Sequence, residues 1–166
     1  MIRPVLVAPA AVLGEKGAEV DPTDPEIVKL ADDLLETMRV SPGCVGLAAP
    51  QLGVPAQVFA VDVTGHPKAK MCHGPFVLCN ARVEEASQWQ KGREGCMSVP
   101  DLTGDVKRAG RLVVVGAVPS TGEERRITTD AFEARALQHE IDHCAGLLFL
   151  DRVAGAHAIY ARKVYL

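Results

Sequence analysis

The sequence predicts an α+β fold, and three observations support this prediction. Two segments with the apolar spacing of helices lie far apart along the chain. Segments typical of strands lie between them without a regular helix–strand alternation, which disfavours a parallel βαβ sheet. The 166 residues match one ordinary domain, and no repeat, low-complexity tract or long linker divides them. We therefore expect a single domain over residues 1–166.

The first helix is predicted from about Pro25 to Met38. Asp24 can cap its first turn, and proline is favoured at the first helical position. The tripeptide at 41–43, Ser-Pro-Gly, ends it. Its apolar face consists of Ile27, Leu30, Ala31, Leu34, Leu35 and Met38.

The central part of the chain contains three predicted strands, which are rich in Val and Phe. They run over Gln57–Val63, Phe76–Glu84 and Arg111–Val118. Glycine and proline commonly mark turns, so we expect turns around the intervening positions. These are Pro67, Gly74–Pro75, Gly104, Gly110 and Ser120–Gly122.

A second helix is predicted from about Asp130 to Ala145. Thr129 or Asp130 can cap it, and Gly146 stands where a glycine commonly follows a helix. The last segment, residues 154–166, is compatible with either a short helix or a closing strand.

Composition limits the classes of function. A net charge of −3 and a pI of about 5.9 argue against a nucleic-acid-binding protein, which normally presents a basic face. No apolar run approaches the roughly 20 residues of a membrane span, and the N-terminal apolar segment is too short for a signal peptide. We therefore expect a cytoplasmic protein. The five cysteines are odd in number and form no C-x-x-C pair, so no disulfide framework is predicted.

The second helix carries the strongest chemical signal, the pentapeptide His139-Glu140-Ile141-Asp142-His143. Residues four apart lie on one helical face, so both imidazoles can reach one cation. Glu140 can lie beside the cation as a general base, as in zinc proteases. A hydrolytic metal usually takes three protein ligands, and the H-E-x-x-H-x-x-G-x-x-H pattern is absent because Phe149 replaces its last histidine. The third ligand could be a carboxylate or a cysteine.

Two further segments are candidates for the same site. Cys96 stands between Gly95 and Met97, and it could be either a metal ligand or a buried thiol. Residues 44–51 are small and apolar up to Gln51, whose amide could bind a ligand or satisfy a buried backbone group.

Taken together, these three segments resemble the peptide deformylase family. Its members carry G-x-G-L-A-A-x-Q, E-G-C-x-S and H-E-x-D-H in this order, matching residues 44–51, 94–98 and 139–143 here. The similarity covers essentially the whole chain. Cys44 departs from the family's first glycine, Met97 replaces the commoner leucine, and the C-terminus is short.

The resemblance implies antiparallel or mixed β-sheets packed around a central helix that carries the H-E-x-x-H motif. The implied metal ligands are Cys96, His139 and His143. The ion is generally Fe²⁺ in this family, with Zn²⁺, Ni²⁺ or Co²⁺ as substitutes. Glu140 would act as general base and then general acid. The side-chain amide of Gln51 and the backbone N–H of Met97 would stabilise the oxyanion.

The resemblance also implies a metal-dependent hydrolase that removes the formyl group from formylmethionyl nascent polypeptides and releases formate. By analogy, the residues expected to contact substrate are Val45, Gly46, Leu47, Gly95, Phe132 and Ala136. The ribosome is a further candidate partner. For Asp142, an ion pair with Arg108 or Arg152 is expected.

Two alternatives remain open from the sequence. A zinc peptidase built on H-E-x-x-H would cleave peptide bonds and would not need Cys96. A catalytically silent deformylase-like protein would bind peptides or ribosomes without needing Glu140.

Overall fold

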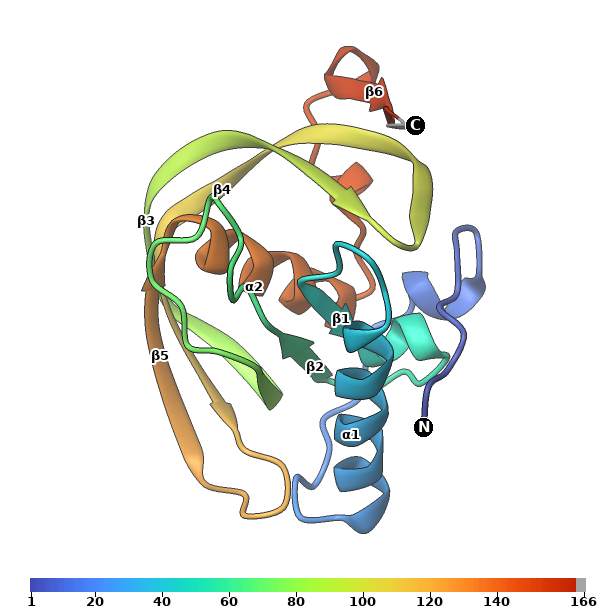
Figure 1. Ribbon diagram of the computed structural model, residues 1–166, viewed down its shortest axis with the longest axis vertical. Coiled ribbons are helices and arrows are strands. Elements are labelled where there is room, and N and C mark those ends of the chain that lie inside the picture. Colours follow the sequence, from blue (N-terminus) through green and yellow to red (C-terminus); the bar gives the residue numbers. More distant parts are fainter. Residues whose placement is uncertain (164–166) are drawn as a thin grey trace.

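The computed structural model describes residues 1–163 and has an α+β architecture, as predicted (Figure 1). The two α-helices are α1 (Pro25–Arg39) and α2 (Ala131–Cys144). The strands are β1 (Gly46–Ala48), β2 (Val58–Val61), β3 (Phe76–Cys96), β4 (Val99–Ala117), β5 (Glu124–Asp130) and β6 (Ile159–Ala161). Four short 3₁₀ helices complete the described chain: η1 (Ala11–Gly14), η2 (Ala49–Leu52), η3 (Phe149–Asp151) and η4 (Ala156–Ala158).

Helix α1 begins where the capping residues predict. The Asp24 carboxylate accepts a hydrogen bond of 2.9 Å from the backbone N–H of Glu26, and Pro25 is the first helical residue. Its apolar face, including Leu30 and Leu34, is buried in a core shared with β1 and β2. The helix therefore packs against β1, a strand that borders the cleft described below.

The strands form one antiparallel sheet in the order β1-β2-β3-β4-β5, and β6 pairs with β4. Strands β3 and β4 are joined in a hairpin of 21 and 19 residues. Three register shifts interrupt their pairing, and irregularities of this kind bend a sheet. Figure 1 shows the hairpin curling around α2, which lies inside the curve.

The strands predicted for this hairpin were too short. Strand β3 continues past Glu84 to Cys96, and the predicted turns at Gly104 and Gly110 were wrong because both glycines lie within β4. A Cβ atom on Gly104 would lie 2.8 Å from Cγ1 of Val153, and one on Gly110 would lie 2.8 Å from the carbonyl oxygen of Gln88. Both glycines therefore allow close approach of neighbouring segments, and neither makes a turn.

Two strands were not predicted, and the C-terminal segment combines both expected conformations. Strand β1 has only three residues, and β5 alternates buried with exposed positions in a largely polar sequence. Short and polar strands carry a weak sequence signal. The C-terminal segment forms η4 and then β6, while its residues 164–166 lie outside the described part of the chain.

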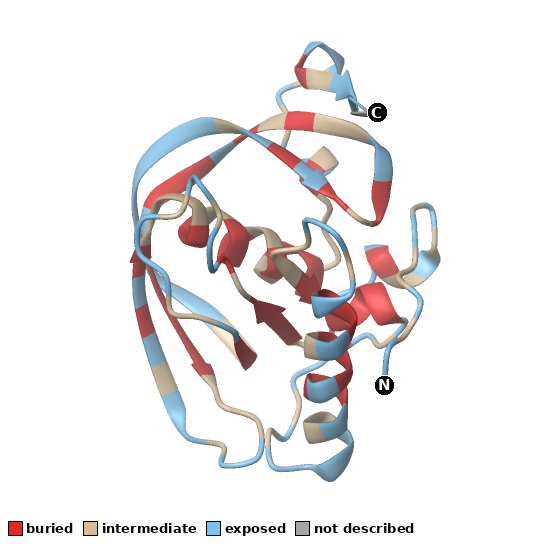
Figure 2. Ribbon diagram, in the orientation of Figure 1, coloured by how far each residue is buried: buried red, intermediate tan, exposed pale blue. Residues whose placement is uncertain are grey.

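Helix α2 is the centre of the fold and is largely buried (Figure 2). The Gln138 amide fixes it to β4, because Nε2 donates to the Ala109 carbonyl oxygen and Oε1 accepts from the Ala109 N–H, both at 2.9 Å. The predicted cap Asp130 makes no capping bond and accepts instead from the Met71 N–H at 3.1 Å. Gly146 follows the helix with φ of +79°, as expected for a terminating glycine.

Within residues 1–163, no helix has both the length and the apolar character that a membrane crossing requires.

Candidate metal centre

Three potential metal ligands converge at the inner face of α2. Cys96 ends β3, while His139 and His143 are one helical turn apart, and the donor atoms of all three lie within 4.8 Å of one another. The Cys96 Sγ is 3.3 Å from Nε2 of His143. Neither His143 nor Cys96 is exposed by more than 7%. The fold thus brings together residues that are more than 40 positions apart in the sequence.

The chemistry of these donors fits a divalent transition metal. The His139 Nδ1 lies 2.9 Å from Oε1 of Glu94 and must donate, because a carboxylate only accepts. This leaves Nε2 of His139 free as a ligand atom. Burial lowers the pKa of His143 to about 3, so its imidazole is neutral, as a ligand must be. One thiolate and two imidazoles suit iron or zinc.

Glu94 orients His139 through Nδ1, the ring nitrogen that is not available to a metal. Its carboxylate also accepts hydrogen bonds from Arg108 at 2.9 and 3.1 Å and from Arg135 at 2.8 Å. Burial alone would raise the pKa of Glu94, but the hydrogen bonds from His139 and Arg108 lower it to about 2. The carboxylate is therefore ionised and can orient His139. Glu94 is the first residue of the resembled segment 94–98, but no role was predicted for it from the sequence.

Replacing this carboxylate is expected to weaken metal binding. Glu94→Gln removes the charged acceptor of His139, and loss of such an outer partner typically lowers metal affinity by about 10–100-fold. Chelator competition measures the effect. Glu84→Gln, an exposed change in the same strand, serves as the control and should leave affinity unchanged. Equal affinities for both variants would contradict this role for Glu94.

Asp142 makes both of the ion pairs that were predicted as alternatives. It accepts a 2.6 Å hydrogen bond from Arg108 and bonds of 3.0 and 3.1 Å from Arg152. Arg108 is itself buried and bridges Asp142 to Glu94. The helix that carries the histidines is therefore tied to β4 and to the segment following η3.

Glu140 lies beside the metal-ligand cluster and is 3% exposed. Burial raises the pKa of Glu140 to about 7. Within residues 1–163, its Oε1 atom has no hydrogen-bond partner, and the residue lines the cleft. A buried carboxyl oxygen without a partner costs free energy, which makes Glu140 a candidate functional group.

Gly46 provides the space that this carboxyl group occupies. A Cβ atom on Gly46 would lie 2.5 Å from Oε2 and 2.9 Å from Cδ of Glu140. Gly46→Ala is therefore expected to displace the carboxyl group and to lower kcat/KM by about 10–100-fold, since a displacement of about 1 Å can have this effect. Metal content should not change.

Gly14→Ala is the matched control, because a Cβ atom there meets nothing within 4 Å. An unchanged kcat/KM for Gly46→Ala, measured beside this control, would show that Glu140 tolerates displacement.

Gln51, in η2, has a fixed amide orientation. Its Oε1 accepts from the Ala48 N–H at 3.0 Å, and its Nε2 donates to Oγ of Ser98 at 3.0 Å. Ser98 Oγ in turn donates to the Leu6 carbonyl oxygen at 2.7 Å. Nε2 also lies 3.6 Å from Sγ of Cys96, so an amide donor faces the cluster. The predicted Met97 lies on the cleft wall directly after Cys96.

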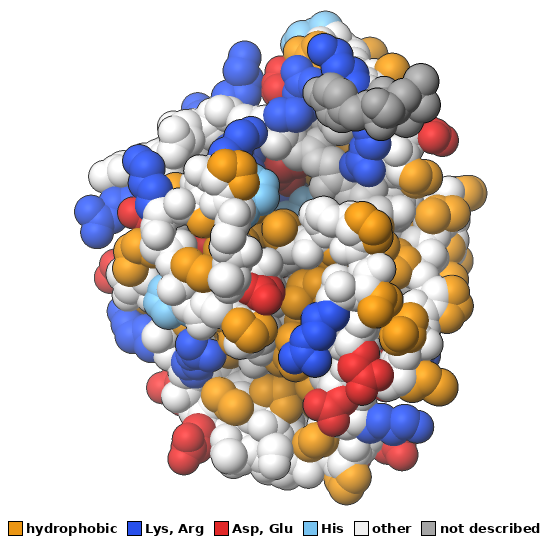
Figure 3. Space-filling view, in the orientation of Figure 1, with side chains coloured by type: hydrophobic (Ala, Val, Ile, Leu, Met, Phe, Trp, Pro, Cys, Tyr) orange, Lys and Arg blue, Asp and Glu red, His pale blue; other side chains and the backbone are white. Residues whose placement is uncertain are grey.

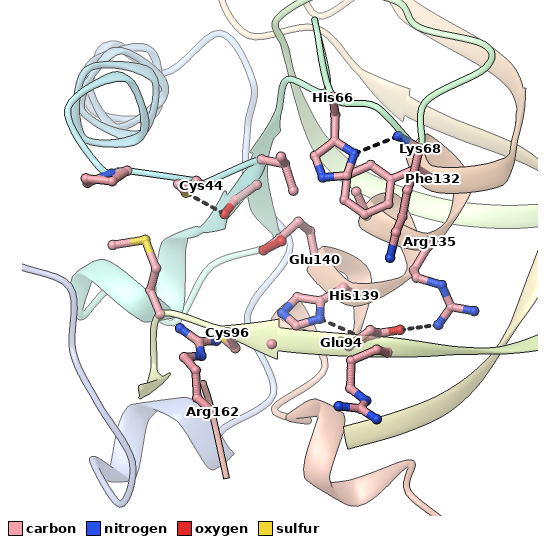
Figure 4. A pocket seen from close by; sticks show the side chains of 18 of the residues that line it. Cys44, His66, Lys68, Glu94, Cys96, Phe132, Arg135, His139, Glu140 and Arg162 are labelled. Carbon is pink, nitrogen blue, oxygen red and sulfur yellow. Dashed lines mark hydrogen bonds and ion pairs between the residues drawn. The ribbon is translucent and has the colours of Figure 1, made fainter. Parts of the chain in front are cut away.

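A cleft of about 810 Å³ opens onto this cluster (Figure 4). Its wall includes five of the six residues expected to contact substrate: Val45, Gly46, Gly95, Phe132 and Ala136. Leu47 is the exception, because it is fully buried in the core beside α1. The wall also includes cationic residues that were not predicted from the sequence: Lys68, Arg93, Arg135 and Arg162. No motif contains Lys68 or Arg162, so only the tertiary structure places them here.

Cys44, which replaces a glycine of the resembled motif, lines the cleft. Its thiol donates to the Gly46 carbonyl oxygen at 3.1 Å. Burial raises the pKa of Cys44 to about 12, so this thiol stays protonated, unlike a metal-binding thiolate.

Comparisons with known proteins agree with this geometry. The family model described as polypeptide deformylase matches residues 2–158. A peptide deformylase of Rhizobium meliloti (strain 1021) is 38% identical over 154 residues, which cover 92% of this chain and 86% of the relative. One of Aquifex aeolicus (strain VF5) is 37% identical over 165 residues, covering 99% and 95%. The crystal structure of peptide deformylase from Ehrlichia chaffeensis superposes with a TM-score of 0.85 at 32% identity, covering 93% of this chain and 89% of that one. The chain therefore belongs to the polypeptide deformylase family.

Proposed function

We propose that this chain hydrolyses the N-terminal formyl group of formylmethionyl polypeptides in the cleft beside Cys96, His139 and His143. Membership of the family gives the reaction, which is metal-dependent removal of the formyl group with release of formate. The observation that carries the assignment to this cleft is the cysteine–histidine–histidine cluster with Glu140 beside it. Residues 1–166 would form one catalytic domain.

A formamide is an unactivated amide, so its hydrolysis needs an activated water and stabilisation of a tetrahedral oxyanion. A divalent ion held by the three ligands would supply Lewis-acid chemistry, which lowers the pKa of bound water and polarises a carbonyl group. Glu140 accepts the proton of the attacking water and then delivers it to the departing amine.

Gln51 and Met97 are proposed to stabilise the oxyanion. Because Ala48 holds the Gln51 oxygen, the Nε2 group is the part of the amide available to the cleft. The backbone N–H of Met97 would be the second donor. Donors that are already oriented stabilise a developing charge without reorganisation during the reaction.

Substrate recognition is proposed to have two parts. Gly46 and Gly95 line the cleft beside the cluster. A tight site there would admit the small formyl group and reject a larger acyl group. Val45, Phe132 and Ala136 are apolar residues of the wall that would receive the methionine side chain. Strand β1 stands at one end of the strand order, so the following peptide backbone could add to its edge.

We propose Fe²⁺ as the ion, with Zn²⁺, Ni²⁺ or Co²⁺ able to replace it, because a thiolate with two imidazoles suits all of these. We also propose that the protein acts in the cytoplasm and meets nascent chains at the ribosome.

The test is formate release from formyl-Met-Ala-Ser by protein purified anaerobically with Fe²⁺. We expect formate and free Met-Ala-Ser as the products, and no turnover of acetyl-Met-Ala-Ser. Cleavage between residues of the peptide would instead support a zinc peptidase. Tight binding of the peptide without formate release, by folded and metal-loaded protein, would support a silent binding protein.

A further inference from the structure

Strand β6 brings a cation from the C-terminal segment to the cleft. β6 pairs with β4 through Leu102↔Ala161 and Thr103↔Tyr160, and the Arg162 N–H continues this ladder by donating to the Asp101 carbonyl oxygen at 2.9 Å. These backbone bonds fix the position of the Arg162 backbone, and so the point from which its side chain extends. The residue lies more than 60 positions from Cys96 in the sequence, yet both line the cleft.

The side chain of Tyr160 locks this strand against the hairpin. Its hydroxyl donates to Asp105 at 2.8 Å, and the guanidinium of Arg93 stacks on its ring at 3.7 Å from the centroid. Residues two apart in a strand point to the same side. Arg162 directly follows β6 and continues its pairing, so its side chain points to the same side as Tyr160. A Cβ atom on Gly95 would clash with Nη2 of Arg162, so the guanidinium lies directly against Gly95.

Arg162 and Lys68 are the two cations of the cleft wall that have no acidic partner within the described part of the chain. Within residues 1–163, neither side chain forms an ion pair, whereas Arg135 is paired with Glu94 and Arg93 with Asp105. Figure 4 shows Arg162 and Lys68 on opposite sides of the cleft. Among the described residues, the acidic members of the wall are Glu94 and Glu140, both buried beside the cluster.

The positive charge continues beyond the cleft. A neighbouring hollow of about 290 Å³ shares part of the same wall. Its cationic lining residues are Lys68, Lys70, Lys91, Arg93 and Arg135, and its lining includes no acidic residue of the described chain. Figure 3 shows Lys and Arg side chains around the hollowed upper part of this face. This concentration is notable in a chain with a net charge of −3.

We propose that Arg162, with Lys68 opposite, makes the enzyme prefer formylated peptides that carry an aspartate or glutamate side chain soon after the methionine. The proposal rests on the proposed function, because it requires the peptide to leave the cluster between these two cations. A guanidinium can bind a carboxylate through two parallel hydrogen bonds, so Arg162 is the selective member of the pair.

The test compares kcat/KM for peptides that differ only in one charge. Formyl-Met-Asp-Ala-Ser-amide and formyl-Met-Ala-Asp-Ser-amide are each measured beside their Asn counterparts, and the amide cap removes the terminal carboxylate. We expect the better Asp peptide to exceed its Asn counterpart by about two- to fivefold at low salt, the size of an exposed ion pair. The ratio should fall toward one in 1 M salt, where charges are screened over about 3 Å.

Variants assign the preference to a residue. The measured quantity is the ratio of kcat/KM for the Asp peptide to kcat/KM for its Asn counterpart. Arg162→Ala should bring this ratio to about one, and Arg162→Lys should leave it between one and the wild-type value. Arg162→Glu should make the Asn peptide the better substrate. Lys163→Ala is the matched control, because this exposed neighbouring cation is not part of the cleft wall, and it should leave the ratio unchanged.

The outcomes separate the two proposals. Absence of formate from every peptide would overturn the proposed function. Formate release with equal rates for Asp and Asn peptides, or a preference that survives Arg162→Ala, would overturn this inference alone. A preference seen only with uncapped peptides would mean that Arg162 binds the C-terminal carboxylate of the peptide, and it would also overturn this inference.

Discussion

Glu140→Gln is expected to lower kcat/KM for formyl-Met-Ala-Ser by about 10²–10⁴-fold, the usual contribution of a general acid–base group. The variant keeps the size of the side chain but cannot take a proton from water or return one to the amine. Glu140 is not one of the three potential metal ligands, so the metal content of the variant should match the wild type. Formate release and metal content, measured on the same preparation, test both statements.

The control for this experiment is Glu19→Gln, an exposed change away from the cleft that should have no effect. A rate for Glu140→Gln within a few-fold of the wild type would remove Glu140 from the reaction. A catalytically silent binding protein would also show equal peptide binding by wild type and variant, but no formate from either.

Cys96→Ala is expected to lose both the metal and the activity. Two imidazoles would remain, whereas a catalytic metal usually has three protein ligands. Loss of an outer partner alone lowers metal affinity by about 10–100-fold. Loss of a ligand itself should therefore lower metal affinity by more than about 100-fold. Metal retained after dialysis against a chelator, together with formate release, measures the effect.

Cys79→Ala is the matched control, because Cys79 is a fully buried cysteine of the same strand that lies outside the ligand cluster. It should lower stability but keep the metal. The zinc-peptidase alternative makes the opposite prediction for Cys96, since its H-E-x-x-H site would take its third ligand elsewhere and would not need this thiol. Full metal content and activity in Cys96→Ala would therefore favour that alternative.

Local signals in the sequence were sufficient for the helices. Asp24, Pro25 and the apolar spacing located α1 to within one residue at its C-terminal end. Gly146 marked the end of α2, and the four-residue spacing of His139 and His143 placed both on one helical face. Such signals act over one or two turns, so they can be recognised without knowledge of distant residues.

The strands were predicted less well because their extent depends on partners elsewhere in the chain. The central glycines of β4 look like turn residues, and only the segments packed against Gly104 and Gly110 explain why no side chain is present there. Strand propensity is similarly weak wherever packing decides the conformation. The length and curl of the β3–β4 hairpin therefore could not be predicted.

The sequence by itself determined the two helices and the histidine pair on one helical face. Through the family resemblance it also predicted that Cys96, Glu140 and Gln51 belong to the same site, and the structure places all three beside the histidines. Only the tertiary structure placed Glu94 against His139, opened the space at Gly46 for Glu140, and brought Arg162 against Gly95. The physical reason is distance along the chain. Contacts between residues tens of positions apart arise from sheet pairing and core packing, and no local pattern of residue types records them.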